Sequence, residues 1–449
     1  MTDGTLYRAH LERLDGALAD ALERSAARGL ALDGVLFHAG RSRLYHSDDN
    51  PTPFRPTPHF VRWVPLAGPE HCVLARPGRR PLVVRVAPKD YWFETAPLSP
   101  SYWQDSVELA EVDGFSDVPS ALGPLGRVAY VGNEPAAAAA LGVPAELVEP
   151  DPLMRPLDWH RAVKTDHEVA LIEAACREAA EGQRVARKAF EAGRSEREIF
   201  FAYLEASRQL ESEAPFVPIV ALDEKSAVLH YQNKRAAPDG PGRVFLLDAG
   251  AECDGYASDI TRTWCSPAAD PVFHQIVEGV DALQRELVEL VTPGRPYPEI
   301  NEETHRLATR LLVDAGVVKA DPERALALGI SRTFLPHGVG HHLGIQVHDV
   351  GGRQAGPDGG EVAPPDSDPF LRNTRTLQAG HVVTIEPGVY FIPMLLEPLR
   401  QGSDAGLIDW GLVDRLVPCG GVRIEDDIVC TPEGPRDLTR PLLAGPRGI

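Results

Sequence analysis

The chain has 449 residues, with 45 Lys and Arg against 65 Asp and Glu, so its formal net charge is −20 at pH 7. An apolar share of 43% and a charged share of 24% are ordinary for a folded protein and exclude a disordered chain. The acidic balance, without a basic cluster, argues against nucleic acid and anionic membranes as partners. The length predicts two or three domains, each with its own core.

The location of the protein follows from its first residues and its cysteines. The N-terminus is charged and amphipathic and lacks the apolar stretch of a signal peptide, and no run approaches the roughly 18 apolar residues that span a membrane. The 6 cysteines form no CxxC pair, which is typical of a reducing compartment. We therefore expect a cytoplasmic protein that makes no membrane contact.

Residues 1–155 are expected to form a smaller α/β domain. Strand-like runs occur at 34–37, 81–86 and 127–132, between segments of helical character. A stretch rich in Ala and Pro ends near Trp159, and we place the domain boundary there, close to residue 155.

Residues 160–445 are expected to form a larger α+β domain. Thr165 with Glu168, and Ser195 with Glu198, form two capping boxes that predict helix starts. Further helices are predicted at 272–291 and 298–315, and strands at 218–222, 243–247, 382–385 and 422–429. Residues 353–369, rich in Pro, Gly and Asp, are expected to form an unstructured surface loop or a lid.

Two aspartates stand on a predicted hairpin. Asp248 ends one apolar strand, Asp259 starts the next, and turn-forming residues lie between them. A turn centred on Cys253 and Asp254 would place the two carboxylates directly opposite each other on one face, where bare charges repel. A positive ion between them would neutralise the repulsion. The alternative is that both aspartates are exposed to solvent on the hairpin and bind no ion.

Histidines and glutamates add to this set. His337, His341 and His348 lie close together amid glycines, Glu386 ends an apolar strand, and Glu425 interrupts another. A carboxylate at the end of a buried strand is unfavourable unless it is paired or binds a metal. Four carboxylates and one imidazole are the ligands expected around a pair of divalent ions.

The motifs around these residues resemble those of the pita-bread metallopeptidases, which include methionine aminopeptidase, aminopeptidase P and prolidase. They read DAG at 248–250, DITRT at 259–263, HGVGHHLG at 337–344, VHDVGG at 347–352, TIEPG at 384–388 and RIEDD at 423–427. The resemblance implies a pita-bread, creatinase/aminopeptidase-like catalytic domain after a smaller N-terminal domain of the creatinase/prolidase type. Residues 48–65, 371–375 and 390–396 are similar to the bacterial Xaa-Pro dipeptidase branch.

The resemblance also implies roles for individual residues. The implied metal ligands are Asp248, Asp259, His341, Glu386 and Glu425. Catalytic roles are implied for Glu386 as proton carrier, for His230 and His348 beside the substrate, and for Arg423 beside a ligand carboxylate. Substrate-binding roles are implied for Arg372, His337, Tyr231 and, from a neighbouring subunit, Asp48.

The implied activity is hydrolysis of dipeptides with C-terminal proline by a metallo-dipeptidase that forms a homodimer. Two divalent ions, Mn²⁺ first and Co²⁺ or Zn²⁺ as alternatives, would activate the attacking water. Three alternatives stay open at this stage. They are aminopeptidase P activity on longer Xaa-Pro peptides, a side activity on organophosphate triesters, and a non-catalytic peptide-binding relative of the same fold.

Overall fold

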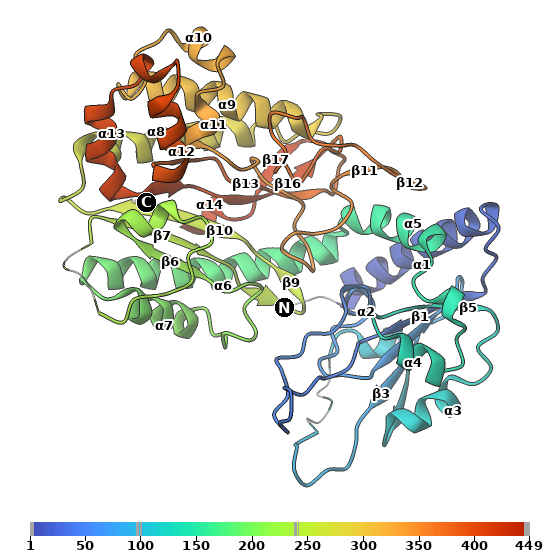
Figure 1. The fold of residues 1–449 in the computed structure, drawn as a ribbon. Helices are drawn as coiled ribbons and strands as arrows, with labels where there is room; N and C mark the ends of the chain where they lie inside the picture. Colours follow the sequence, from blue (N-terminus) through green and yellow to red (C-terminus); the bar gives the residue numbers. More distant parts are fainter. Residues whose placement is uncertain (1–3, 96–97, 99–100, 238–239, 241, 444–449) are drawn as a thin grey trace. The chain divides into compact units, whose positions relative to one another are not determined.

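A computed structural model describes residues 4–95, 98, 101–237, 240 and 242–443 (Figure 1). The chain divides into two compact units, Met1–Leu171 with Gly356–Gly360, and Ile172–Ala355 with Glu361–Ile449. No helix in the described ranges is both long and apolar enough to cross a membrane. The six cysteines are free thiols.

The first unit is built on one five-stranded sheet with the order β4-β3-β2-β1-β5. Strands β1 and β3 occupy the positions expected from the sequence, as does β5, whereas β2 and β4 were not predicted. The β1–β2 and β2–β3 pairs are antiparallel, and the β1–β5 and β3–β4 pairs are parallel. Its strands are β1 (Gly34–His38), β2 (Cys72–Ala75), β3 (Leu82–Val86), β4 (Glu108–Val112) and β5 (Val128–Val131). Its helices are α1 (Gly4–Ala27), α2 (Pro58–Trp63), α3 (Val118–Leu122), α4 (Pro135–Ala140) and α5 (Asp151–Ala162).

Two long helices begin at the capping boxes found in the sequence. Helix α6 (Asp166–Glu191) follows Thr165, whose hydroxyl accepts from the Glu168 backbone N–H while the Glu168 carboxylate accepts from the Thr165 N–H. Helix α7 (Glu196–Ala206) starts in the same way at Ser195. Helices α8 (Pro271–Val288) and α9 (Tyr297–Asp314) match the two remaining predictions closely.

The second unit places strands between two pairs of helices. One antiparallel sheet has the order β10-β7-β6, and its strands are β6 (Ile219–Leu222), β7 (Val244–Ala249) and β10 (Ile260–Cys265). Another has the order β13-β16-β17, with β13 (Val382–Ile385), β16 (Asp426–Thr431) and β17 (Gly434–Asp437). Two-stranded pairs add β8 (Glu252–Cys253) with β9 (Tyr256–Ala257) and β14 (Gly388–Tyr390) with β15 (Gly421–Arg423). A further pair, β11 (Gln354–Gly356) with β12 (Gly359–Glu361), includes Gly356–Gly360, which belong to the first unit. The shorter helices are α10 (Pro322–Ala327), α11 (Ser331–Phe334), α12 (Pro393–Gln401), α13 (Trp410–Leu416) and α14 (Arg440–Leu443).

The apolar faces of strands β7 and β13 pack against the helix pairs. Phe245 and Leu247 of β7 pack in one core cluster with α6 and α7, while Val383 and Ile385 of β13 pack with α8 and α9. Because side chains alternate along a strand, Asp248 points away from α6 and α7. The polar residues of β7 and β13 are thereby directed away from the helices.

The hairpin that carries the two aspartates has a different register from the predicted one. Thr261, not Asp259, pairs with Asp248. The turn is centred on Asp254 and Gly255, whose φ values of 48° and 86° are both left-handed, as a type I′ turn requires. Moving the turn by one residue changes the pairing by two, so Asp248 and Asp259 keep a common face as diagonal neighbours.

Two further segments differ from their predictions. The strand expected at 422–429 is broken at Ile424 and Glu425 into β15 and β16. The Glu425 N–H there donates to the carbonyl of Thr261 in β10, 3.0 Å away. The segment 353–369 is not unstructured throughout, because it contains the β11–β12 hairpin.

Candidate metal centre

The second unit contains a cavity of about 570 Å³ that brings most of the predicted site residues together. Asp248 lies near the end of β7, Asp259 directly before β10, His341 in the segment before β13, Glu386 directly after β13, and Glu425 at the break between β15 and β16. The predicted residues that line it are Asp248, Asp259, His341, Glu386, Glu425, His230, His337, His348, Arg372 and Arg423.

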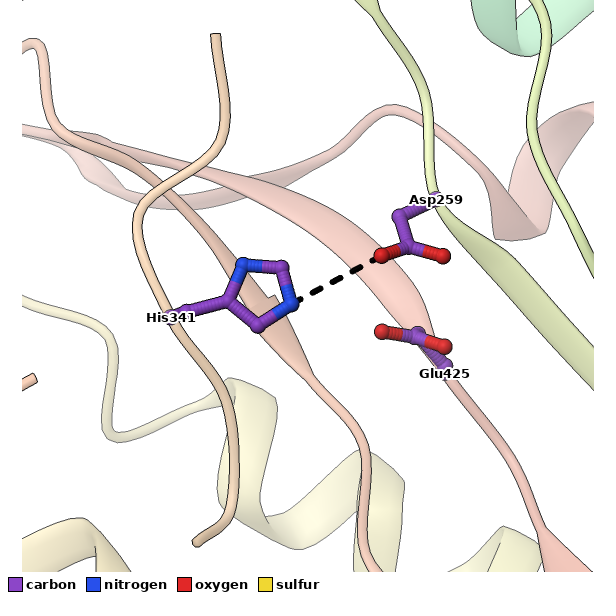
Figure 2. A group of neighbouring side chains, drawn as sticks. All are labelled: Asp259, His341 and Glu425. Carbon is purple, nitrogen blue, oxygen red and sulfur yellow. Dashed lines mark ion pairs between the residues drawn. The ribbon is translucent and has the colours of Figure 1, made fainter. Parts of the chain in front are cut away.

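Three of these residues form a group with metal-site spacing. Asp259, His341 and Glu425 each offer one ligand atom, and these atoms lie within 4.8 Å of one another (Figure 2). His341 Nε2 lies 3.6 Å from Asp259 Oδ2 and 3.6 Å from Glu386 Oε1. Both distances exceed a hydrogen bond, but they suit atoms that share one ion.

The orientation of His341 leaves one ring nitrogen for a ligand. Its Nδ1 lies 3.0 Å from the His342 carbonyl oxygen, which can only accept, so Nδ1 carries the proton and Nε2 keeps its lone pair. Burial and the neighbouring His348 lower the pKa of His341 to about 3, so the ring is neutral at pH 7. A neutral imidazole is the form that binds metals.

The carboxylates show the unsatisfied charge that a cation would neutralise. Asp248 Oδ1 and Asp259 Oδ1 are buried and have no hydrogen-bond partner in the described structure. Burial and the nearby Glu425 and Asp248 raise the pKa of Asp259 well above its usual range, and burial with Glu386 does the same for Glu425. Burial also raises the pKa of Glu386 to about 7. Unpartnered, crowded carboxylates fit a divalent metal site.

Arg423 supplies a positive charge at the edge of this group. Its guanidinium donates to Asp248 Oδ2 at 2.5 Å, to the Tyr390 hydroxyl at 2.8 Å and to Thr261 Oγ1 at 3.2 Å. Arg423 thus bonds Oδ2 of Asp248, while Oδ1 is buried without a hydrogen-bond partner among the described residues.

The other predicted histidines surround the group. The His348 ring lies edge-on to the His341 ring, with centroids 4.5 Å apart, and His230 lines the same cavity. His337 is half-buried; its Nε2 lies 2.9 Å from the Tyr390 hydroxyl and its Nδ1 4.0 Å from Glu386 Oε2. All three rings are therefore within the cavity that holds the carboxylates.

A model of metallopeptidase family M24 matches residues 170–432, the part of the chain that contains this whole cavity. The chain belongs to metallopeptidase family M24. A model of the Xaa-Pro dipeptidase N-terminal domain matches residues 5–159 of this M24 chain. The resemblance inferred from the motifs is thus confirmed, as is the predicted fold class, a pita-bread catalytic domain preceded by a separate N-terminal domain.

Relatives of this M24 chain were found along its whole length. It is 41% identical to the Xaa-Pro dipeptidase of Xanthomonas campestris pv. campestris (strain 8004), covering 98% of both chains. It is 37% identical to the Xaa-Pro dipeptidase of Shewanella woodyi, covering 97% of both. Among solved structures, zinc-substituted aminopeptidase P of E. coli matches with a TM-score of 0.69 at 24% identity, covering 95% of this chain and 96% of that chain. At that identity the structural likeness concerns the fold alone.

Two predicted residues of this M24 chain are not among the described residues that line the cavity. Tyr231 is buried with Ile219 and Leu246, and its hydroxyl donates to Glu196 at 2.8 Å. The structure therefore places Tyr231 in the core directly after His230, and its contact with substrate stays a prediction. Asp48 is exposed in the first unit, where its carboxylate accepts from Asn50.

The site of this M24 chain also contains residues that the sequence did not single out. Thr261 donates to Glu425 Oε2 at 2.5 Å and accepts from Arg423, and Tyr390 joins Arg423 to His337. Strand alternation could have indicated Thr261, which lies two residues from Asp259 on the same face. Tyr390 offered no comparable signal, since its partners come from distant segments.

Proposed function

We propose that this M24 chain is a metal-dependent Xaa-Pro dipeptidase, which hydrolyses dipeptides whose second residue is proline. The observation that carries the proposal is the convergence of four carboxylates and His341 on one cavity, where Asp248 Oδ1 and Asp259 Oδ1 have no hydrogen-bond partner among the described residues. The full-length likeness to Xaa-Pro dipeptidases supports the choice of substrate.

The ligands would divide between two ions. Asp248 and Asp259 would hold one ion, His341 and Glu386 the other, and Asp259 and Glu425 would reach both. When bound, the ions would supply a water that ionises near neutral pH and would polarise the scissile carbonyl. Oxygen-rich ligation with one imidazole suits Mn²⁺, which we propose, ahead of Co²⁺ and Zn²⁺.

The chain's own residues would move the proton and hold the substrate. Glu386 would accept the proton of the attacking water and return it to the departing proline nitrogen. His230 and His348 line the cavity, where they would hydrogen-bond the substrate, and His337 would add a further contact. Arg423 would keep the Asp248 carboxylate in one orientation through their 2.5 Å hydrogen bond.

Recognition of a dipeptide requires contacts with both of its ends. Arg372 lines the cavity and would bind the C-terminal carboxylate, for which a guanidinium is well shaped. Asp48 of a second copy would meet the free amine, which implies a homodimer. Proline would be selected because its nitrogen, lacking a hydrogen, offers no donor.

The proposal extends to the arrangement and location of the protein. An N-terminal domain at 1–155 would precede a catalytic domain at 160–445, in line with the ranges that the two family models match. The cytoplasm remains the proposed location, on the grounds of the cysteine content.

The rival activity is that of aminopeptidase P, whose solved structures share this fold. Hydrolysis of Leu-Pro and Leu-Pro-Gly by the Mn²⁺-loaded protein separates the two. We expect the dipeptide to be cleaved with the higher kcat/KM, and the Asp259→Asn variant to be inactive. Equal or faster cleavage of the tripeptide would favour aminopeptidase P activity.

A further inference from the structure

The residues just before Arg372 form one wall of the cavity although they belong to no helix or strand. Pro369, Phe370 and Arg372 all line the cavity. The Arg372 side chain is exposed there, and it has no hydrogen-bond or ion-pair partner in the part of the chain that the structure describes. A wall without secondary structure needs other contacts to keep its shape.

Asp368 provides such contacts at the start of the wall. Its carboxylate accepts from Arg332 Nε at 3.0 Å and from Arg332 Nη2 at 2.9 Å, a bidentate pair. His305 Nε2 lies 3.0 Å from the same carboxylate, and the side chains of His305 and Asp368 are 2% and 10% exposed. Asp368 thereby ties the wall to helices α9 and α11, which carry His305 and Arg332.

The electrostatics of this contact favour an ionised carboxylate. Burial opposes the charge, but hydrogen bonds from Arg332 and Ser367 lower the pKa of Asp368 below its usual value. Burial and Arg332 lower the pKa of His305 to about 4, so a neutral ring donates its Nε2 hydrogen to Asp368. The Ser331 hydroxyl, 3.3 Å away, occupies the other ring nitrogen. The buried pair is thus fully hydrogen-bonded, which a rigid anchor requires.

The backbone of the wall is held as well. The Leu371 N–H donates to the Asp368 carbonyl at 3.0 Å. Arg353 donates to the Leu371 carbonyl from Nε at 3.2 Å and from Nη2 at 2.8 Å. The chain is therefore fixed on both sides of Phe370, immediately before Arg372.

We propose that Asp368 is a positioning residue that sets substrate specificity: by anchoring the wall, it holds the Arg372 guanidinium where the carboxylate of a C-terminal proline arrives. The inference rests on the proposed function, because it assigns Arg372 to that carboxylate. A charged group kept in place before binding loses less entropy on binding, so loosening the anchor weakens recognition of the carboxylate and leaves the chemistry intact.

Leu-Pro and Leu-prolinamide test this role, since the amide lacks the negative charge that Arg372 would bind. In Asp368→Asn, the side-chain NH₂ would face an N–H donor of Arg332 or His305 where a carboxylate oxygen now accepts. One hydrogen bond would be lost and the anchor would loosen. We expect the KM for Leu-Pro to rise about tenfold with kcat within about twofold, and the KM for Leu-prolinamide to stay unchanged. Asp366→Asn, an exposed aspartate two residues away, is the matched control and should behave as wild type.

Other outcomes overturn the proposal in recognisable ways. If Asp368→Asn matches the wild type with both substrates, or raises the KM equally for both, Asp368 has no positioning role. If the wild-type protein cleaves neither substrate, the proposed function is refuted instead. Amide hydrogen exchange at 370–373 then still tests the anchor: we expect faster exchange in Asp368→Asn and unchanged exchange in Asp366→Asn. If Asp368→Asn does not fold, Arg332→Gln removes the bidentate partner and should give the same kinetic pattern.

Discussion

Arg423 is a cation whose side chain contacts the candidate metal ligand Asp248, and its replacement by Met would remove the charge while keeping an unbranched side chain. The Arg423 side chain is 6% exposed and pairs with Asp248, with further hydrogen bonds to Tyr390 and Thr261. In Arg423→Met, the Asp248 carboxylate would be left buried among other carboxylates without its compensating charge.

The expected loss follows from this burial. Removing one partner of a buried ion pair costs about 3–5 kcal/mol, whereas an exposed pair contributes about 0–1 kcal/mol. Arg436, whose side chain is 52% exposed, pairs with Glu173 on the surface and supplies the matched control Arg436→Met. We expect Arg423→Met to lower the unfolding free energy of the chelator-treated protein by about 3–5 kcal/mol, and Arg436→Met by less than about 1 kcal/mol.

Metal provides the second half of this prediction. Bound divalent ions would neutralise Asp248 in place of the guanidinium, so saturating Mn²⁺ should reduce the deficit of Arg423→Met by roughly half and leave Arg436→Met unchanged. Urea unfolding followed by tryptophan fluorescence, with chelator and with Mn²⁺, measures both effects. Equal losses in the two variants, or a deficit of Arg423→Met that metal does not alter, would refute the reasoning.

Three further changes probe other parts of the chain. Burial opposes ionisation of Glu168, but Arg62 lowers the pKa of this carboxyl to about 2, so the ionised form stabilises the fold above about pH 4.5. We expect urea unfolding at pH 6 to show a deficit of roughly 3 kcal/mol for Glu168→Gln, which should vanish as the pH falls toward 2. Thr261→Val removes the donor to a ligand carboxylate and should weaken Mn²⁺ binding about 10–100-fold by calorimetry, with kcat retained at saturating metal. Gly340→Ala would place a Cβ 2.1 Å from the Thr384 carbonyl oxygen at φ 157°, so calorimetry should detect no Mn²⁺ binding at the adjacent His341; normal binding would contradict the need for this close approach.

The sequence was most informative where chemistry is local. The two capping boxes predicted the starts of α6 and α7 because each depends on two side chains three residues apart. The types and order of the carboxylates and His341 likewise stood in short motifs, so the ligand set could be proposed before their meeting in one cavity was known.

Features that depend on distant contacts were not predictable in the same way. The hairpin turn falls on Asp254 and Gly255 because both adopt left-handed backbone conformations, which places the pairing two positions from the predicted one. The break at Glu425 arises because its N–H bonds to Thr261 from another strand. The anchor at Asp368 joins a loop to two helices, and no pattern in the local sequence indicates it.

Titration of the metal-free protein with Mn²⁺, with Leu-Pro hydrolysis as the readout, tests the central claim most directly. We predict no hydrolysis without metal and a rate that rises to a plateau near two equivalents of Mn²⁺, while Asp259→Asn stays inactive throughout. Hydrolysis that persists in the metal-free protein, or a metal-saturated protein that leaves Leu-Pro intact, would contradict the account.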